Sequence, residues 1–123
     1  MKYELSQRFY FDAAHTLRRQ IEAEGSRRIH GHTYHAEVTL SGLPDPETGM
    51  MLDLGFLRQE IERLRQQLDH HFLDEVEGIG PATLENLCAY IHRQLQARLP
   101  HISCITVERP ASGDRCRFFP HAD

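Results

Sequence analysis

IHGHTYHAEVTL, residues 29–40, is the stretch that decides the fold of this chain. Residues 33–40 are rich in β-branched side chains and lie between glycines 31 and 42, which predicts a β-strand. His30 and His32 stand at the mouth of this strand. Because residues two apart project to the same face of an extended backbone, we expect both imidazoles to point the same way.

Two imidazoles on one face suit a transition metal, since neutral imidazole is a common zinc ligand. Gly31 between them lets the chain come close to whatever they hold. His15 closes the run FYFDAAH at residues 9–15 and supplies a third donor if the first strand pairs antiparallel with the second. Three histidines without a fourth protein ligand describe an open, catalytic-type zinc site. The alternative is a chance H-x-H pair in a chain with nine histidines.

Size and composition set broad limits. A length of 123 residues predicts a single domain over 1–123 with one core. The net charge of −4 comes from interspersed acidic and basic residues, so we expect no nucleic-acid partner and no anionic membrane surface. No signal peptide or membrane-spanning run is recognisable. The three scattered cysteines predict neither a disulfide framework nor a metal knuckle, which favours the reducing cytoplasm.

Arginines gather beside the histidines. Arg18 and Arg19 follow His15, and Arg27 and Arg28 precede His30. They either attract an anionic substrate or form a solvated surface.

The remaining pattern is ββααββ. It predicts strands at 3–12, 33–41, 102–107 and 115–119, and a loop over 16–29 with a helical turn near 20–23. Asp53 and Thr83 each begin a helix with one apolar face, and Pro100 stops the second. We expect an α+β fold whose four-stranded antiparallel sheet carries two helices on one face. Its two exposed edges predict a homo-oligomer whose sheets join edge to edge.

Six motifs along the whole chain resemble the 6-pyruvoyl-tetrahydropterin synthase family, which includes the 6-carboxytetrahydropterin synthases of bacterial queuosine biosynthesis. They are FDAAH at 11–15, HGHxY at 30–34, MxDxxFL at 51–57, LDHHxL at 68–73, PxTxENL at 81–87 and VE at 107–108. The short chain looks more like the bacterial branch. The resemblance implies a tunnelling fold, in which trimers close a β-barrel, two trimers stack, and active sites lie at subunit interfaces.

The resemblance also assigns roles. It implies that His15, His30 and His32 hold zinc, which binds side-chain oxygens of 7,8-dihydroneopterin triphosphate and acidifies the adjacent C–H bonds. Glu108 matches the carboxylate that anchors the pterin, whose two-donor edge a carboxylate can accept. Two further residues, Thr83 and Glu85, match positions near the pterin pocket, although helix capping explains them equally well.

Asp69 and His70 match the catalytic pair of the family. A carboxylate that accepts from one imidazole nitrogen fixes the tautomer and leaves the other nitrogen to move protons. The alternative is that the Asp-His-His run only ends a helix, where a charged histidine suits the C-terminal dipole.

One catalytic position departs from the family. The family has a proton-abstracting cysteine four residues before the first histidine of HGH, and Ser26 stands there in this chain. A thiol of pKa ~8.5 can be brought into the working range by a neighbouring metal or histidine, whereas a serine hydroxyl is a poor base.

Three accounts of Ser26 are open. In the first, the chain makes 6-carboxy-5,6,7,8-tetrahydropterin, with His70, a zinc-bound hydroxide or Glu24 as the base. In the second, it makes another pterin, either the 6-pyruvoyl product or, with a glutamate replacing the cysteine, 6-hydroxymethyl-dihydropterin for folate. In the third, it is a non-catalytic pterin- or zinc-binding paralogue. The intact Asp69, His70 and Glu108 argue against complete loss of catalysis. We therefore expect a zinc-dependent pterin-side-chain lyase, most of all of the 6-carboxytetrahydropterin synthase type.

Overall fold

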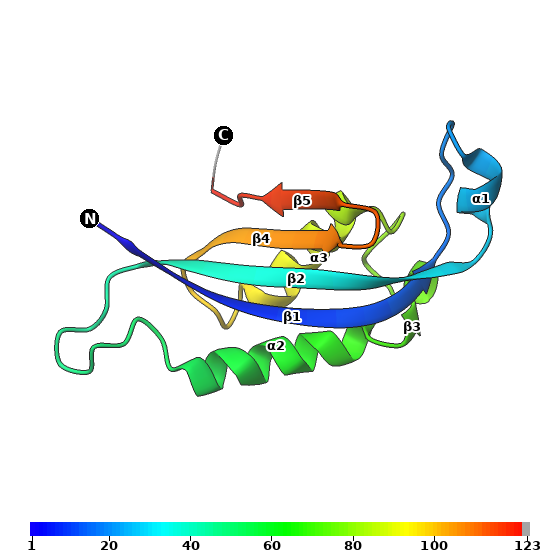
Figure 1. Cartoon of the computed structure of the whole chain (residues 1–123). Coiled ribbons are helices and arrows are strands. Elements are labelled where there is room, and N and C mark those ends of the chain that lie inside the picture. Colours follow the sequence, from blue (N-terminus) through cyan, green and yellow to red (C-terminus); the bar gives the residue numbers. More distant parts are fainter. Residues whose placement is uncertain (122–123) are drawn as a thin grey trace.

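The computed structural model describes residues 1–121 and places an extended sheet against two long helices (Figure 1). The elements in chain order are β1 (Tyr3–His15), α1 (Ala23–Arg27), β2 (His30–Gly42), α2 (Leu54–Leu68), β3 (His71–Phe72), the 3₁₀ turn η1 (Leu73–Glu75), α3 (Leu84–Leu95), β4 (Ile102–Arg109) and β5 (Asp114–Phe118). Within these residues no helix combines the length and the apolar character needed to cross a membrane.

The sheet has the order β3-β1-β2-β4-β5. The α+β class is confirmed, but the prediction of four antiparallel strands was wrong in one respect. A fifth strand, β3, pairs parallel with β1 through Ala13↔His71 and Ala14↔Phe72. A strand of two residues is too short to show a pattern in the sequence. His71 and Phe72 pair because the chain leaving α2 returns along the outer edge of β1. Within one chain the sheet is open rather than closed into a barrel.

The central hairpin is longer than the sequence predicted. β1 and β2 pair antiparallel along their whole length, from Tyr3↔Gly42 to His15↔His30. His30 and His32 therefore belong to β2 itself, at the end of the paired strands where His15 and His30 form the last pair. Cross-strand hydrogen bonding extends both strands past the β-branched stretch, which is a tertiary effect that local propensity does not report.

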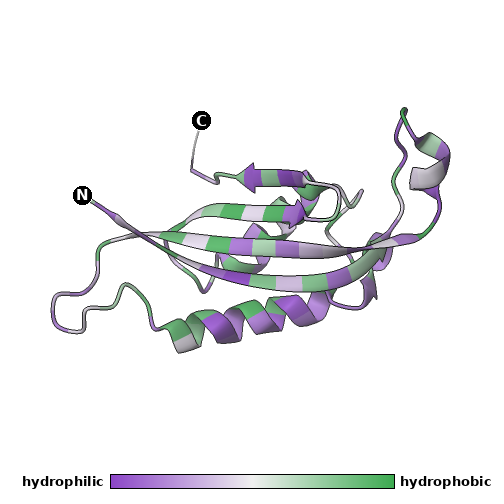
Figure 2. Ribbon diagram, in the orientation of Figure 1, coloured by the Kyte–Doolittle hydropathy of each residue, from purple (hydrophilic) through white to green (hydrophobic). Residues whose placement is uncertain are grey.

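One face of the sheet builds the core. Figure 2 shows hydrophilic and hydrophobic bands alternating along β1 and β2, as expected for strands with one buried face. Phe11 and Tyr34 are fully buried and stack with their ring centroids 5.0 Å apart. The apolar faces of α2 and α3 cover the same layer through Leu57, Leu64, Leu87 and Ile91.

Both predicted helix starts are confirmed. The Asp53 carboxylate accepts a hydrogen bond from the Gly55 N–H at 2.8 Å, and the Thr83 hydroxyl accepts one from the Asn86 N–H at 3.1 Å. The helical turn expected near 20–23 lies slightly later, at Ala23–Arg27.

Candidate metal centre and active site

Three histidines converge at one end of the β1–β2 hairpin. His15 ends β1, and His30 and His32 begin β2. Each offers a ring nitrogen within 4.8 Å of the others. His15 is fully buried and the other two are half-buried. The structure thus brings together all three predicted ligands in an arrangement that can bind a metal ion.

Backbone carbonyls orient two of the rings. His15 Nδ1 lies 3.0 Å from the Ala82 carbonyl oxygen, and His30 Nδ1 lies 2.7 Å from that of Arg28. A carbonyl oxygen only accepts, so each Nδ1 carries the proton and each Nε2 keeps a lone pair for a ligand. Ala82 and Arg28 act through their backbones, which no side-chain pattern in the sequence could reveal.

The nitrogen spacing fits a small cation. His15 Nε2 and His32 Nε2 are 3.1 Å apart. Two ligands at the ~2.0–2.1 Å typical of zinc–imidazole bonds in a tetrahedral site stand about 3.3 Å apart. Because His15 Nε2 presents a lone pair, either a cation or a proton on His32 Nε2 lies between the two nitrogens at this distance. The donor set therefore fits a divalent metal that prefers nitrogen ligands.

The environment keeps the imidazoles neutral. Burial lowers the pKa of His15, and it lowers the pKa of His32 to about 4, assisted by the neighbouring histidines and by Arg109. Neutral imidazole is the form that binds metal. Gly31 is not required by crowding within the chain, because a Cβ there would meet only the Ala13 carbonyl oxygen at an ordinary 3.6 Å.

Two neighbours of the histidines were not predicted. The Tyr34 hydroxyl lies 3.5 Å from His15 Nδ1, and burial raises its pKa to about 12, so it stays protonated. Arg109, only 14% exposed, bonds Asp114 at 3.1 Å, and its Nε is buried without a partner among the described residues. The alternation of β2 could have placed Tyr34 on the histidine face, whereas Arg109 follows only from strand pairing.

Asp69 and His70 form a hydrogen-bonded pair held against β1. Asp69 accepts from the Asp12 backbone N–H at 2.9 Å and lies 2.9 Å from His70 Nδ1. The hydrogen bond from Asp12 is the main reason that the pKa of Asp69 is lowered, with a further contribution from His70. The His70 N–H in turn donates to the Asp12 carbonyl at 2.6 Å, which holds His70 at a φ of 59°. Because Nδ1 of the exposed His70 ring is bonded to Asp69, Nε2 is the ring nitrogen that is available to other groups.

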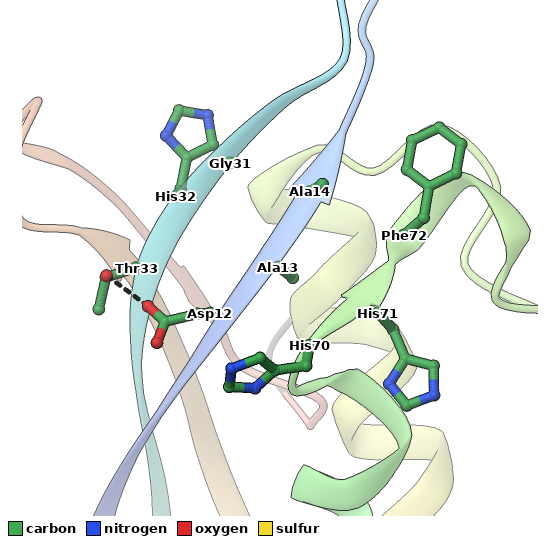
Figure 3. Close-up of a pocket in the computed structure, with 9 residues that line it drawn as sticks. All are labelled: Asp12, Ala13, Ala14, Gly31, His32, Thr33, His70, His71 and Phe72. Atoms are coloured by element: carbon green, nitrogen blue, oxygen red, sulfur yellow. Dashed lines mark hydrogen bonds between the residues drawn. The ribbon is translucent and has the colours of Figure 1, made fainter.

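His70 and one of the three clustered histidines, His32, line one open hollow of about 530 Å³ (Figure 3). Gly31 lines it beside His32 on β2, and His71 of β3 lines it beside His70. Between them Asp12 accepts a hydrogen bond from the Thr33 hydroxyl, drawn dashed in Figure 3. The hollow therefore connects the Asp69–His70 pair with one member of the histidine cluster.

Ser26 and Glu24 do not line this hollow. The buried Ser26 hydroxyl donates to the Ala23 carbonyl at 2.9 Å and accepts from the Arg19 N–H at 3.4 Å. Glu24 is exposed and paired with Arg28 at 3.1 Å. Both side chains therefore form their contacts within the β1–β2 loop.

The predicted pterin-binding residues are also dispersed. Glu108 lines a separate hollow of about 40 Å³ between β2 and β5, with the Arg115 guanidinium 4.0 Å away. Thr83 caps α3, and Glu85 is exposed in its first turn. Within one chain these residues do not meet the histidines in a single cavity.

The fold and site thus define an α+β protein with a cluster of three histidines that could hold a metal ion and a hydrogen-bonded Asp–His pair. Residues 4–118 match the family model described as 6-pyruvoyl tetrahydropterin synthase. The chain belongs to this family, as its motifs predicted.

Individual proteins similar to this chain carry the names of the same family. The chain is 32% identical over 106 residues to the 6-carboxy-5,6,7,8-tetrahydropterin synthase of Synechocystis sp., covering 80% of each chain. It is 34% identical over 111 residues to the human 6-pyruvoyl tetrahydrobiopterin synthase, covering 79% of this chain and 77% of the human one. The 6-pyruvoyl tetrahydropterin synthase of Caenorhabditis elegans shares the fold with a TM-score of 0.84 and 25% identity, over 97% and 96% of the two chains.

Proposed function

We propose that this protein is a zinc-dependent pterin-side-chain lyase that converts 7,8-dihydroneopterin triphosphate into 6-carboxy-5,6,7,8-tetrahydropterin. The observation that carries the proposal is the convergence of His15, His30 and His32, together with a hollow that both His32 and His70 line. Zinc held by the three histidines would supply Lewis acidity toward the side-chain oxygens of the substrate. The similarity to the Synechocystis enzyme, at 32% identity, supports this product, and the similarity to the human enzyme, at 34% identity, makes the 6-pyruvoyl product the alternative.

His70 is the proton carrier in this proposal. Asp69 accepts from Nδ1, which fixes the ring tautomer and stabilises the charged imidazolium when Nε2 takes a proton. His70 also takes over the task of the family cysteine, because the Ser26 hydroxyl and Glu24 are committed to contacts within the loop.

We further propose that two or three protomers complete each site. Glu108 would anchor the pterin, yet its hollow of about 40 Å³ holds no more than a few waters. A bicyclic ring must therefore lie in space that a neighbouring protomer helps to enclose. Residues 3–9 of β1 have no strand neighbour on their outer side in the described chain, and they offer the edge for such pairing. We expect a trimer or a dimer of trimers in the cytoplasm.

The test is to incubate the zinc-loaded protein with 7,8-dihydroneopterin triphosphate and to identify the pterin by mass spectrometry. The proposal expects 6-carboxytetrahydropterin and acetaldehyde from the wild type, and no turnover from His70→Ala. A matched Ser26→Cys variant should change the rate but not the product. Turnover that appears only in Ser26→Cys would show that the native chain is a binder, and a different pterin would reassign the product.

A further inference from the structure

Two arginines on the β1–β2 loop lack partners and face the same hollow. Arg18 and Arg27, together with Thr16 and Leu17, line a hollow of about 380 Å³. Arg19 pairs with Glu22 at 2.9 Å and Arg28 with Glu24 at 3.1 Å. In the part of the chain that the structure describes, neither Arg18 nor Arg27 forms an ion pair or a side-chain hydrogen bond. Two of the four loop arginines are thus free to bind an anion.

The loop holds these two arginines next to the metal centre. Strand pairing ends at His15↔His30, and the Leu17 N–H then donates to the Ser26 carbonyl at 2.7 Å across the base of the loop. Arg18 and Arg27 flank this bond, each three residues from a metal histidine. Three residues span at most about 10–11 Å even when fully extended. The Cα atoms of Arg18 and Arg27 therefore lie no more than about 10–11 Å from those of His15 and His30.

The neighbouring surface is also favourable to an anion. A second hollow of about 350 Å³ shares Thr16, Leu17 and Arg18 and extends to Thr83 at the start of α3. Helix N-termini carry partial positive charge and exposed N–H groups. The one acidic residue lining this hollow, Asp74, already accepts hydrogen bonds from the Thr16 N–H at 2.9 Å and from the Thr16 hydroxyl. Its charge is thus partly compensated by donors.

We propose that Arg18 and Arg27 form the subsite for the phosphate end of a phosphorylated pterin, an inference that rests on the proposed function. The guanidinium fork matches phosphate oxygens and remains charged at any working pH. When the side-chain oxygens of the substrate lie at the histidines, the terminal phosphate lies several bonds further along. The β1–β2 loop adjoins the histidines in the chain, so its arginines are placed to bind that phosphate. The subsite explains how the chain selects a phosphorylated pterin over the free one.

The experiment measures affinity by isothermal titration calorimetry in chains that all carry His70→Ala, which the proposed function expects to abolish turnover of the triphosphate. The zinc-loaded parent chain, Arg18→Gln, Arg27→Gln, the double variant and the control Arg28→Gln are titrated with 7,8-dihydroneopterin and with its triphosphate. Arg28 is the matched control because it is adjacent to Arg27 and loses the same charge but is already paired with Glu24 and lines neither hollow. Circular dichroism verifies that all variants are folded.

We expect the parent chain to bind the triphosphate at least tenfold more tightly than dihydroneopterin. The double variant should bind both ligands within about twofold of each other while its affinity for dihydroneopterin is unchanged, and Arg28→Gln should keep most of the preference. A tenfold preference that survives in the double variant would overturn the subsite and leave the proposed function standing. If the parent chain bound neither pterin, the proposed function would fail and the subsite with it.

Discussion

Replacing His32 by alanine tests the metal centre most directly. His32 supplies one of the three nitrogens, and His15 Nε2, 3.1 Å away, is the hydrogen-bonding partner of its ring. The metal-free fold should therefore tolerate the change. Removing second-shell partners typically weakens metal affinity 10–100-fold, so the loss of a direct ligand should weaken it at least ~100-fold.

The expected effect on stability follows from linkage. A metal present at 100 times its Kd stabilises the folded chain by about 2.7 kcal/mol, which is roughly 10 °C in Tm for a chain of this size. A 100-fold weaker site under the same conditions contributes only about 0.4 kcal/mol, or less than about 2 °C. The metal-induced rise in Tm should thus nearly disappear.

Differential scanning calorimetry with and without zinc measures this rise, and atomic absorption measures the bound metal. His35→Ala is the matched control, because His35 lies on the same strand but is exposed on the opposite face. The control should keep the full shift and one equivalent of zinc per chain. A His32→Ala protein that behaved like this control would refute the three-histidine ligand set.

Four further experiments test other residues of the site and its supporting helix. Asp69→Asn should lower kcat by about 10²–10⁴ while zinc content stays unchanged, because His70 loses the carboxylate that stabilises its charged form; an unaltered kcat would exclude the pair from proton transfer. Glu108→Ala should weaken pterin binding by several kcal/mol, since each stranded buried donor costs ~1–3 kcal/mol, and unchanged affinity in calorimetry would remove Glu108 from the site. Thr83→Ala should cost about 1 kcal/mol in urea unfolding through the lost cap of α3, whereas Thr83→Ser should cost much less. In the metal-free protein the pKa of His32 is about 4 in the folded chain and an ordinary 6.5 in the unfolded chain, so the unfolded chain binds more protons between these pH values. The free energy of unfolding should therefore fall as the pH drops through this window. The His32→Ala variant should show a flatter dependence of this free energy on pH in the same window.

Side-chain periodicity made much of the architecture predictable. The β-branched run at 33–40 predicted the main part of β2, and Asp53 and Thr83 predicted where α2 and α3 begin. The alternation of side chains along an extended strand placed His30 and His32 on one face, and the motif order identified the family. These features depend on local patterns that the sequence carries directly.

The missed features depend on contacts between distant segments. The two-residue β3 exists only because Ala13 and Ala14 offer it an edge. The Ala82 carbonyl reaches His15 across 67 positions of sequence, and Arg109 approaches the histidines because β4 pairs beside β2. Backbone groups and pairing partners have no side-chain signature, so these parts of the site needed the structure.

The register of β1 against β2 joins the core to the metal centre. Stacking of the buried Phe11 and Tyr34 and the Arg8–Glu37 ion pair on the opposite face, at 3.1 Å, both require the observed pairing. A slip of one residue would bury charged side chains and turn His15 away from His30, because side chains alternate between faces. The interactions that fix the core therefore also fix the three imidazoles, before any metal arrives. It follows that the buried hairpin positions the three imidazoles, and we expect metal binding to need no change in the pairing of β1 and β2.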